Sequence, residues 1–187
     1  STGMYVFGAL TVILSLLCFS NTKVWRNSET LWTNVLKVSG NIPVAYFGLG
    51  NYLSTIEEFE RALFNFNQSL NYNPNHVPSR FHKTNILVEL ERYEEALYNI
   101  NDCLLRRPKS TIFLEKRAFI HYKLNQVDAA LADINEAIVL PEAQQSAYLI
   151  RADIFLADGR LDKALEDVNA AIQLDSFDWL AHQKAAI

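Results

Sequence analysis

Four short segments of this chain resemble one another and recur every 34 residues. They read FERALFNFNQSL, YEEALYNINDCL, VDAALADINEAI and LDKALEDVNAAI. Each has an alanine at the same point, and these alanines are Ala62, Ala96, Ala130 and Ala164. A sequence period of this length indicates a stack of similar units, each a small piece of supersecondary structure. The repeat therefore constrains the fold more than any other feature of the chain.

Apolar and small residues recur at intervals of three and four within each segment, which places them on one face of a helix. In the first segment they are Phe59, Ala62, Leu63, Phe66, Ser69 and Leu70, and in the fourth they are Leu161, Ala164, Leu165, Val168, Ala171 and Ile172. The alanines are small because another helix crosses there. A larger side chain would force the helices apart at a cost of roughly 1–3 kcal/mol.

The stretches around these segments predict helical hairpins. Pro74 and Pro108 also lie 34 residues apart, and a proline just after a helix prevents the helix from continuing. Gly50, in the helix before the first segment, lets two helices approach closely because it has no Cβ. The predicted repeats are 43–76, 77–110, 111–144 and 145–178. A following helix would start near Trp179 and end with the chain, so we expect 179–187 to be a truncated further element.

These residues resemble the tetratricopeptide repeat (TPR) family, whose period and small-residue positions they match over about 43–178. The resemblance implies an all-α fold, a right-handed α-solenoid of helix hairpins. It also implies that the first helices of the hairpins line a concave face that binds proteins.

One departure from the family pattern has a structural explanation. The family usually has leucine before the small residue of the first helix, as in Leu49-Gly50, whereas the last two repeats have Arg117-Ala118 and Arg151-Ala152. Sixteen residues later, the second helices carry Asn65, Asn99, Asp133 and Asp167. Arginine and aspartate thus appear together, which predicts the ion pairs Arg117–Asp133 and Arg151–Asp167.

A different pattern precedes the repeats. Residues 3–20, GMYVFGALTVILSLLCFS, contain no charge, and about 20 such residues span a hydrocarbon core of roughly 30 Å. We interpret 1–22 as a transmembrane helix, the alternative being an apolar helix buried in a protein core. Residues 23–42 are then a linker with an orphan repeat helix near 24–39, in which Trp32 occupies the large core position.

The rest of the composition argues against chemistry in this segment. The net charge is −4, which gives no indication of the concentrated basic surface that nucleic-acid binding requires. Cys18 and Cys103 lie in apolar helical patterns, and the four histidines show no metal-ligand spacing. We therefore predict no catalytic residue, metal, cofactor or small-molecule substrate, and no nucleic-acid partner.

The TPR resemblance also implies a binding site for an extended peptide of a partner protein. The family positions that face the groove fall here on Phe47, Asn51, Phe81, Asn85, Glu115, Phe119, Tyr122, Lys123 and Asp153. Asn51 and Asn85 would grip the ligand backbone, because an amide both donates and accepts hydrogen bonds. The lysines that hold a carboxylate in chaperone-binding members are absent, so that specificity is not expected. The alternative is that the groove is empty or holds another part of the same chain.

A second resemblance concerns the junction between the apolar run and the repeats. The order of an apolar helix, VWRNSETLWTNVLKVSGNIPVAYFGLGNYL and the repeats is similar to that in polytopic O-mannosyltransferase-like proteins with C-terminal TPRs. It implies an alternative function, in which this segment is the tail of a membrane glycosyltransferase whose catalytic domain precedes it. Either function places the chain at a membrane through residues 3–20, and the second implies that the repeats are extracytoplasmic.

Overall fold

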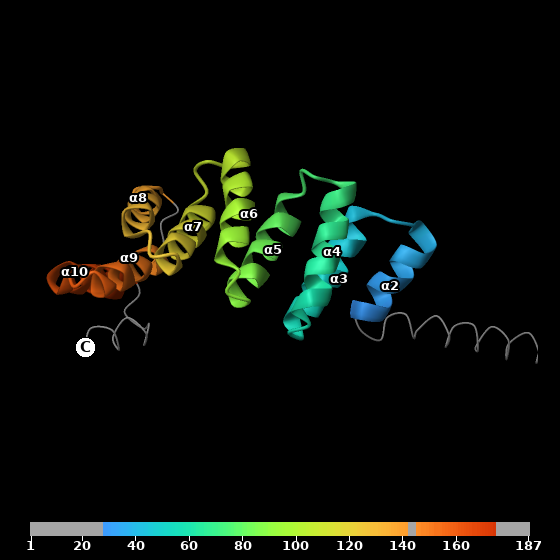
Figure 1. Ribbon diagram of the computed structural model, residues 1–187, viewed down its shortest axis with the longest axis horizontal. Coiled ribbons are helices and arrows are strands. Elements are labelled where there is room, and N and C mark those ends of the chain that lie inside the picture. Colours follow the sequence, from blue (N-terminus) through green and yellow to red (C-terminus); the bar gives the residue numbers. More distant parts are fainter. Residues whose placement is uncertain (1–27, 142–144, 175–187) are drawn as a thin grey trace, which may run out of the picture. The chain divides into compact units, whose positions relative to one another are not determined.

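The computed structural model describes residues 28–141 and 145–174, and this part of the chain contains helices and no strand. The helices are α2 Ser28–Ser39, α3 Pro43–Thr55, α4 Phe59–Tyr72, α5 Val77–Glu89, α6 Tyr93–Arg106, α7 Thr111–Lys123, α8 Val127–Ile138, α9 Gln145–Ala157 and α10 Leu161–Leu174 (Figure 1). The all-α prediction, with eight helices after residue 43, is confirmed for these residues. The chain forms two compact units, Ser1–Ile86 (unit 1) and Leu87–Ile187 (unit 2), whose boundary lies within α5.

The turns inside the hairpins repeat with the same period as the alanines. Three residues separate the two helices of each hairpin, and the middle one has a positive φ. These middle residues are Glu57, Glu91, Asn125 and Gly159, with φ of 60°, 56°, 58° and 75°. The next N–H then donates to the carbonyl five residues back, as from Glu58 to Leu53 at 3.0 Å and from Arg92 to Leu87 at 2.8 Å. This bond ends the first helix and turns the chain back into the second.

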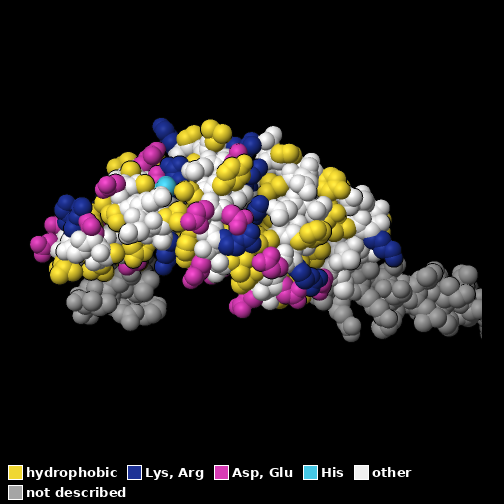
Figure 2. Space-filling model, viewed as in Figure 1, with side chains coloured by type: hydrophobic (Ala, Val, Ile, Leu, Met, Phe, Trp, Pro, Cys, Tyr) yellow, Lys and Arg dark blue, Asp and Glu magenta, His cyan; other side chains and the backbone are white. Residues whose placement is uncertain are grey.

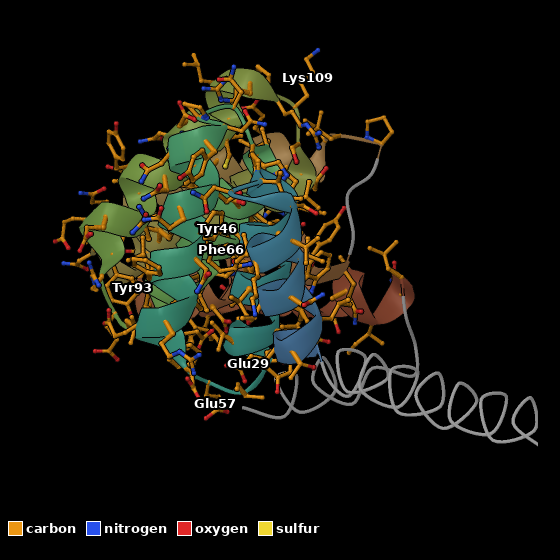
Figure 3. All side chains as sticks on the ribbon, turned by 90° about the vertical axis from the view of Figure 1, so that its right-hand side faces the viewer. Glu29, Tyr46, Glu57, Phe66, Tyr93 and Lys109 are labelled. Atoms are coloured by element: carbon orange, nitrogen blue, oxygen red, sulfur yellow. The ribbon has the colours of Figure 1, made fainter. Side chains whose placement is uncertain are left out.

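In unit 1, α3 packs against α4 around the first alanine of the series. Ala62 and Phe66 are fully buried, as are Ala45 and Leu53 on the facing helix. A Cβ on Gly50 would lie 2.9 Å from the ring of Phe66, so the close approach predicted at this glycine is confirmed. Phe66 projects from α4, and Tyr46 projects from the neighbouring α3 (Figure 3).

The helix α2 packs against α3 although none of its own residues is fully buried. The ring of Trp32 lies against Gly48 so closely that a Cβ there would overlap it. Glu29, labelled in Figure 3, accepts a hydrogen bond from Arg61 of α4 at 2.7 Å. The packing of Trp32 on Gly48 and the Glu29–Arg61 ion pair therefore hold α2 in place. This helix lies inside the stretch 24–39 predicted to be an orphan helix.

In unit 2 the hairpins α7–α8 and α9–α10 pack in the same way, and α8 also contacts α9. Ala96, Ala130 and Ala164 are buried as predicted, and Ala164 forms a core cluster with Ala152, Phe155 and Val168. Two predicted core residues are exposed instead: Leu161 at 65% and Leu165 at 50%. No described helix follows α10, so nothing in the described part of the chain covers these two side chains.

Both predicted ion pairs are confirmed. Arg117 donates from Nε and Nη2 to the two carboxylate oxygens of Asp133, at 2.7 and 2.6 Å. Arg151 binds Asp167 in the same bidentate way, at 2.8 and 2.6 Å. A third residue was not predicted: Asn101 and Asn135 each accept a bond from the Nη1 of these arginines, at 2.9 and 2.6 Å. Each arginine therefore joins its own hairpin to the second helix of the preceding one.

Within residues 28–141 and 145–174, no helix is long and apolar enough to cross a membrane. The predicted transmembrane segment, 3–20, lies outside the described residues, as do the predicted element at 179–187 and the cysteine at position 18. Cys103 is a buried free thiol.

Candidate functional site

All nine residues predicted to face a binding groove lie on the first helices of their hairpins. Phe47 and Asn51 are on α3, Phe81 and Asn85 on α5, Glu115, Phe119, Tyr122 and Lys123 on α7, and Asp153 on α9. Asn51 and Lys123 are exposed and the others are half-buried, so none is lost in the core. Four of them belong to unit 1 and five to unit 2.

In unit 1, Phe47 is the centre of a cluster of rings. Its centroid lies 5.3 Å from those of His76 and His82, each in an edge-to-face arrangement, and 6.2 Å from Phe66. Edge-to-face contacts of this kind stabilise a packed ring beyond the burial of its area. Phe47 is therefore held by internal partners on one side while part of its surface remains accessible.

A chain of hydrogen bonds runs beneath these rings. Ser79 Oγ donates to Ser69 Oγ at 2.8 Å, and Ser69 Oγ donates to the carbonyl of Pro43 at 2.9 Å. His76 precedes α5, and its Nδ1 lies 2.7 Å from Ser79 Oγ and 3.3 Å from the backbone N of Ser79. Burial lowers the pKa of both His76 and His82 below the ordinary value of 6.5, since a charged ring loses hydration there. The neutral forms of both rings suit this packing.

The two asparagines predicted to grip a ligand backbone differ. Asn51 is exposed and offers both ends of its amide. The Oδ1 of Asn85, however, is buried and accepts no hydrogen bond within the described residues. That both asparagines grip a ligand backbone stays a prediction, and in this structure the Asn85 oxygen has no exposed surface to offer a ligand.

In unit 2, the first helices form a cavity of about 260 Å³. It is lined by Val88 and Glu89 at the end of α5, by Ile112, Glu115, Lys116 and Phe119 of α7, and by Ile150 of α9. Glu115 and Phe119 were predicted to belong to the groove, and the other five were not. The walls of the cavity come from three consecutive hairpins, so the pattern within a single repeat does not predict it.

The charged groups of this cavity are partly removed from water. Burial raises the pKa of Glu115, although the hydroxyl of Ser146 donates to its Oε2 at 2.9 Å and Lys116 lies near. Burial lowers the pKa of Lys116, and the carboxylates of Glu89 and Glu115 oppose that shift. Partial desolvation strengthens the interaction of these groups with any charge brought beside them.

The remaining groove residues of unit 2 interact with their neighbours. The ammonium of Lys123 lies 5.3 Å from the ring centre of Phe119 and 5.8 Å from that of Tyr122. These are cation–π distances. Asp153, on α9, also takes part in an interaction.

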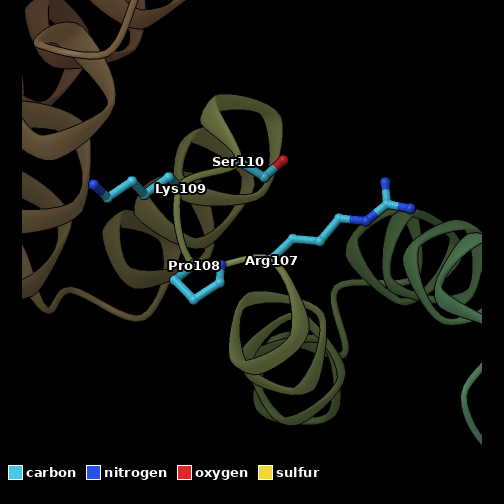
Figure 4. Close-up of a pocket in the computed structure, with 4 residues that line it drawn as sticks. All are labelled: Arg107, Pro108, Lys109 and Ser110. Carbon is cyan, nitrogen blue, oxygen red and sulfur yellow. The ribbon is translucent and has the colours of Figure 1, made fainter.

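Two other hollows offer less. A shallow one of about 580 Å³ surrounds the turn from Arg107 to Ser110, but Figure 4 shows the side chains of Arg107 and Lys109 pointing to opposite sides. They cannot converge on one anion. A second, of about 400 Å³, lies between α6, α7 and α8, and its Arg117 is already held by Asp133 and Asn101.

The described surface carries mixed chemistry. Cations and carboxylates alternate with small hydrophobic areas on the face shown in Figure 2, with no large area of one sign. Within the residues that the structure describes, no three His, Cys, Asp or Glu residues are grouped to hold a metal ion.

Comparison with known proteins gives the family. A model described as tetratricopeptide repeat matches residues 43–76, and a second model of the same description matches 115–178. This chain belongs to the tetratricopeptide repeat family. The first match has the same bounds as the first repeat predicted above.

Solved structures share the fold. A thermophilic TPR protein of Thermus thermophilus has a TM-score of 0.71 and 22% identity, covering 95% of this chain and 94% of that one. MamA of Desulfovibrio magneticus has 0.75 and 16%, covering 91% and 96%. YrrB, described as a TPR protein with an unusual peptide-binding site, has 0.67 and 23%, covering 82% and 79%. TPR folds of this kind typically serve as non-catalytic scaffolds.

Curated relatives match a shorter stretch. Tetratricopeptide repeat protein 17 of Rattus norvegicus and that of Homo sapiens are each 32% identical over 60 residues. That stretch is 32% of this chain and only 5% of the length of either relative. None of these matches shows the resemblance of the junction to O-mannosyltransferase-like proteins.

Proposed function

We propose that this segment is a non-catalytic scaffold that binds an extended segment of a partner protein along the first helices of its TPR hairpins. The observation that carries the proposal is that the nine groove positions, all on the first helices, retain accessible surface.

The chemistry of the first helices suits a peptide. Phe47 and Phe119 supply half-buried apolar area, and the exposed amide of Asn51 can both donate to and accept from a peptide bond. YrrB, which shares the fold, is described as having a peptide-binding site, and this supports the proposal by analogy. A short trough of this kind is expected to bind with micromolar affinity, about −8 kcal/mol.

Site-specific photocrosslinking tests which face binds. A photoreactive phenylalanine replaces exposed first-helix residues, Asn51 or Lys123, and the matched controls place it at exposed second-helix residues, Asn67 or Tyr98. We expect discrete protein adducts from the first two positions and none from the controls. Adducts from Asn67 or Tyr98 alone would place the partner on the outer helices and contradict the proposal.

The membrane part of the proposal depends on residues 3–20 and has its own test. Their uncharged run is long enough to cross a bilayer, and Lys23 and Arg26 follow it. We expect the full chain to float with liposomes in a density gradient and a chain lacking residues 1–22 to stay at the bottom. Flotation of both would assign membrane binding to the repeats instead.

A further inference from the structure

The cavity of unit 2 has apolar walls and a charged rim. Val88, Phe119 and Ile150 are buried or half-buried in it, while Ile112 remains 61% exposed. An isoleucine on the rim of a hollow gains by having its apolar surface covered. The walls thus favour a ligand that inserts an apolar group and covers Ile112.

The rim adds a preference of charge. Two carboxylates, Glu89 and Glu115, stand against one ammonium, Lys116, so the lining has a formal charge of −1 when all three are ionised. Glu89 is exposed and has room for a partner, whereas Glu115 is half-buried and receives the hydroxyl of Ser146. A cation entering beside the apolar group would be attracted by the two carboxylates, whereas an anion would be repelled by them.

We propose that this cavity is an anchor site for a bulky aliphatic side chain of the bound peptide, whose neighbouring residue is lysine or arginine. The inference rests on the proposed peptide-binding function and specifies the partner for one place in it. The aliphatic side chain packs among Val88, Ile112, Phe119 and Ile150. The neighbouring cation lies against Glu89 at the rim, where its long side chain keeps the charge in contact with water.

A selection from phage-displayed random peptides on the immobilised full chain tests this proposal. The enriched peptides are expected to pair leucine, isoleucine, valine or methionine with an adjacent lysine or arginine. Two variants at exposed positions probe the site without disturbing the core: Ile112→Ser removes a wall, and Glu89→Lys reverses the rim charge. Their matched controls are Val139→Ser and Glu166→Lys, which alter exposed residues of unit 2 outside the cavity.

We expect Ile112→Ser to weaken binding of a selected peptide about tenfold and Glu89→Lys to weaken it about threefold to tenfold, with the controls unchanged. Replacing the lysine of the peptide by glutamate should weaken binding to the native chain and restore it to the Glu89→Lys variant. This exchange separates a charge contact from a loss of folding.

The experiment distinguishes a failure of the peptide-binding function from a failure of the anchor site. If no peptide is enriched, the peptide-binding function is wrong and the anchor site with it. If peptides are enriched and bind the Ile112→Ser and Glu89→Lys variants as well as the native chain, the function stands and the anchor site is wrong. Enrichment of acidic peptides would also overturn the anchor site.

Discussion

The first hairpin, α3–α4, and the last two, α7–α8 and α9–α10, have the same fold but different interiors at one equivalent position. The first hairpin has Leu49, which is buried, where the others have Arg117 and Arg151. The facing helix carries Asn65 in the first and an aspartate in the others. Asn65 does not reach across: its Nδ2 donates to the carbonyl of Arg61 in its own helix at 2.8 Å.

This difference separates what the fold requires from what is optional. All these hairpins bury both an alanine of the second helix and a small residue of the first, Gly50, Ala118 or Ala152. In the first hairpin the neighbouring pair is an apolar Leu49 and an Asn65 whose amide bonds its own helix. In the last two hairpins it is a bidentate Arg–Asp ion pair. The buried small residues are therefore common to the three hairpins, whereas the neighbouring pair differs between the first hairpin and the last two.

The largest expected effect comes from breaking one ion pair. In the variant Asp133→Ala, Arg117 keeps a side chain that is only 25% exposed but loses its carboxylate. We expect the free energy of unfolding to fall by about 2–4 kcal/mol, because a partly buried charge is left uncompensated. Urea denaturation followed by circular dichroism measures it.

The matched control is Asn65→Ala at the equivalent position of the first hairpin. It removes one neutral hydrogen bond, which contributes about 1 kcal/mol. Equal losses in the two variants would mean that the two interiors do not differ in energy, and the comparison would fail.

A second prediction concerns one position of the first helix, which is glycine in the first hairpin and a bulkier residue in the last two. Gly48 of the first hairpin supports Trp32, while the equivalent residues of the last two hairpins, Lys116 and Ile150, line the cavity of unit 2. We expect Gly48→Ala to cost about 1–3 kcal/mol, since its Cβ overlaps the indole. Hydrogen exchange should show faster exchange of the amides of α2.

The background variant Trp32→Ala gives the control. Without the ring, Gly48→Ala should stabilise α3 by up to about 1 kcal/mol, because alanine is the better helix former. The same loss in both backgrounds would show that Trp32 does not determine the need for glycine.

A smaller effect is expected from pH near 6.5, through two histidines of unit 1. His76 and His82 have pKa values lowered by burial, so the folded state binds fewer protons than the unfolded state below about pH 6.5. Stability should therefore fall as the pH drops from 6.5 toward the folded pKa values.

The test compares unfolding free energies of the native chain and the double variant His76→Asn, His82→Gln on both sides of pH 6.5. Asparagine keeps a capping acceptor and removes the titration. The variant should lose less stability on acidification than the native chain. Parallel losses would assign the pH effect to other groups.

Much of this architecture follows from sequence because the repeat reports the same position four times. The buried alanines and the two Arg–Asp pairs were predictable, since each residue recurs with its partner at a fixed spacing. Asn101 and Asn135 were not predicted although they also recur, because each lies in the repeat before that of its arginine, whereas the predicted pairs join residues of one repeat. Glu57, Glu91 and Asn125 gave no signal for their left-handed turns, where glycine would be expected.

The binding face was harder to predict for a physical reason. The residues that a family pattern marks are those of one helix, whereas the cavity of unit 2 has walls from three helices. Lys116 and Ile150 were therefore not predicted as site residues. The histidines looked scattered in sequence, yet the packing of α3 brings His76 and His82 to the ring of Phe47.

The smallest expected effect comes from converting one interior into the other. The double variant Arg117→Leu, Asp133→Asn gives the third hairpin the pair found in the first, and Ala118 and Ala130 remain in place. We expect a change within about 1 kcal/mol, because removing both charges of a buried pair also removes the cost of their desolvation. The exposed Asn101 loses its arginine but is rehydrated.

The two single variants make the result decisive. Arg117→Leu alone leaves the carboxylate of Asp133, whose side chain is 8% exposed, without its arginine, and Asp133→Asn alone leaves the guanidinium facing a neutral amide. Each single variant should therefore be less stable than the double variant, which is a positive coupling between the two sites. If the double variant is instead as unstable as the sum of the singles, the ion pair is a requirement of this hairpin and not an alternative to the apolar interior of the first.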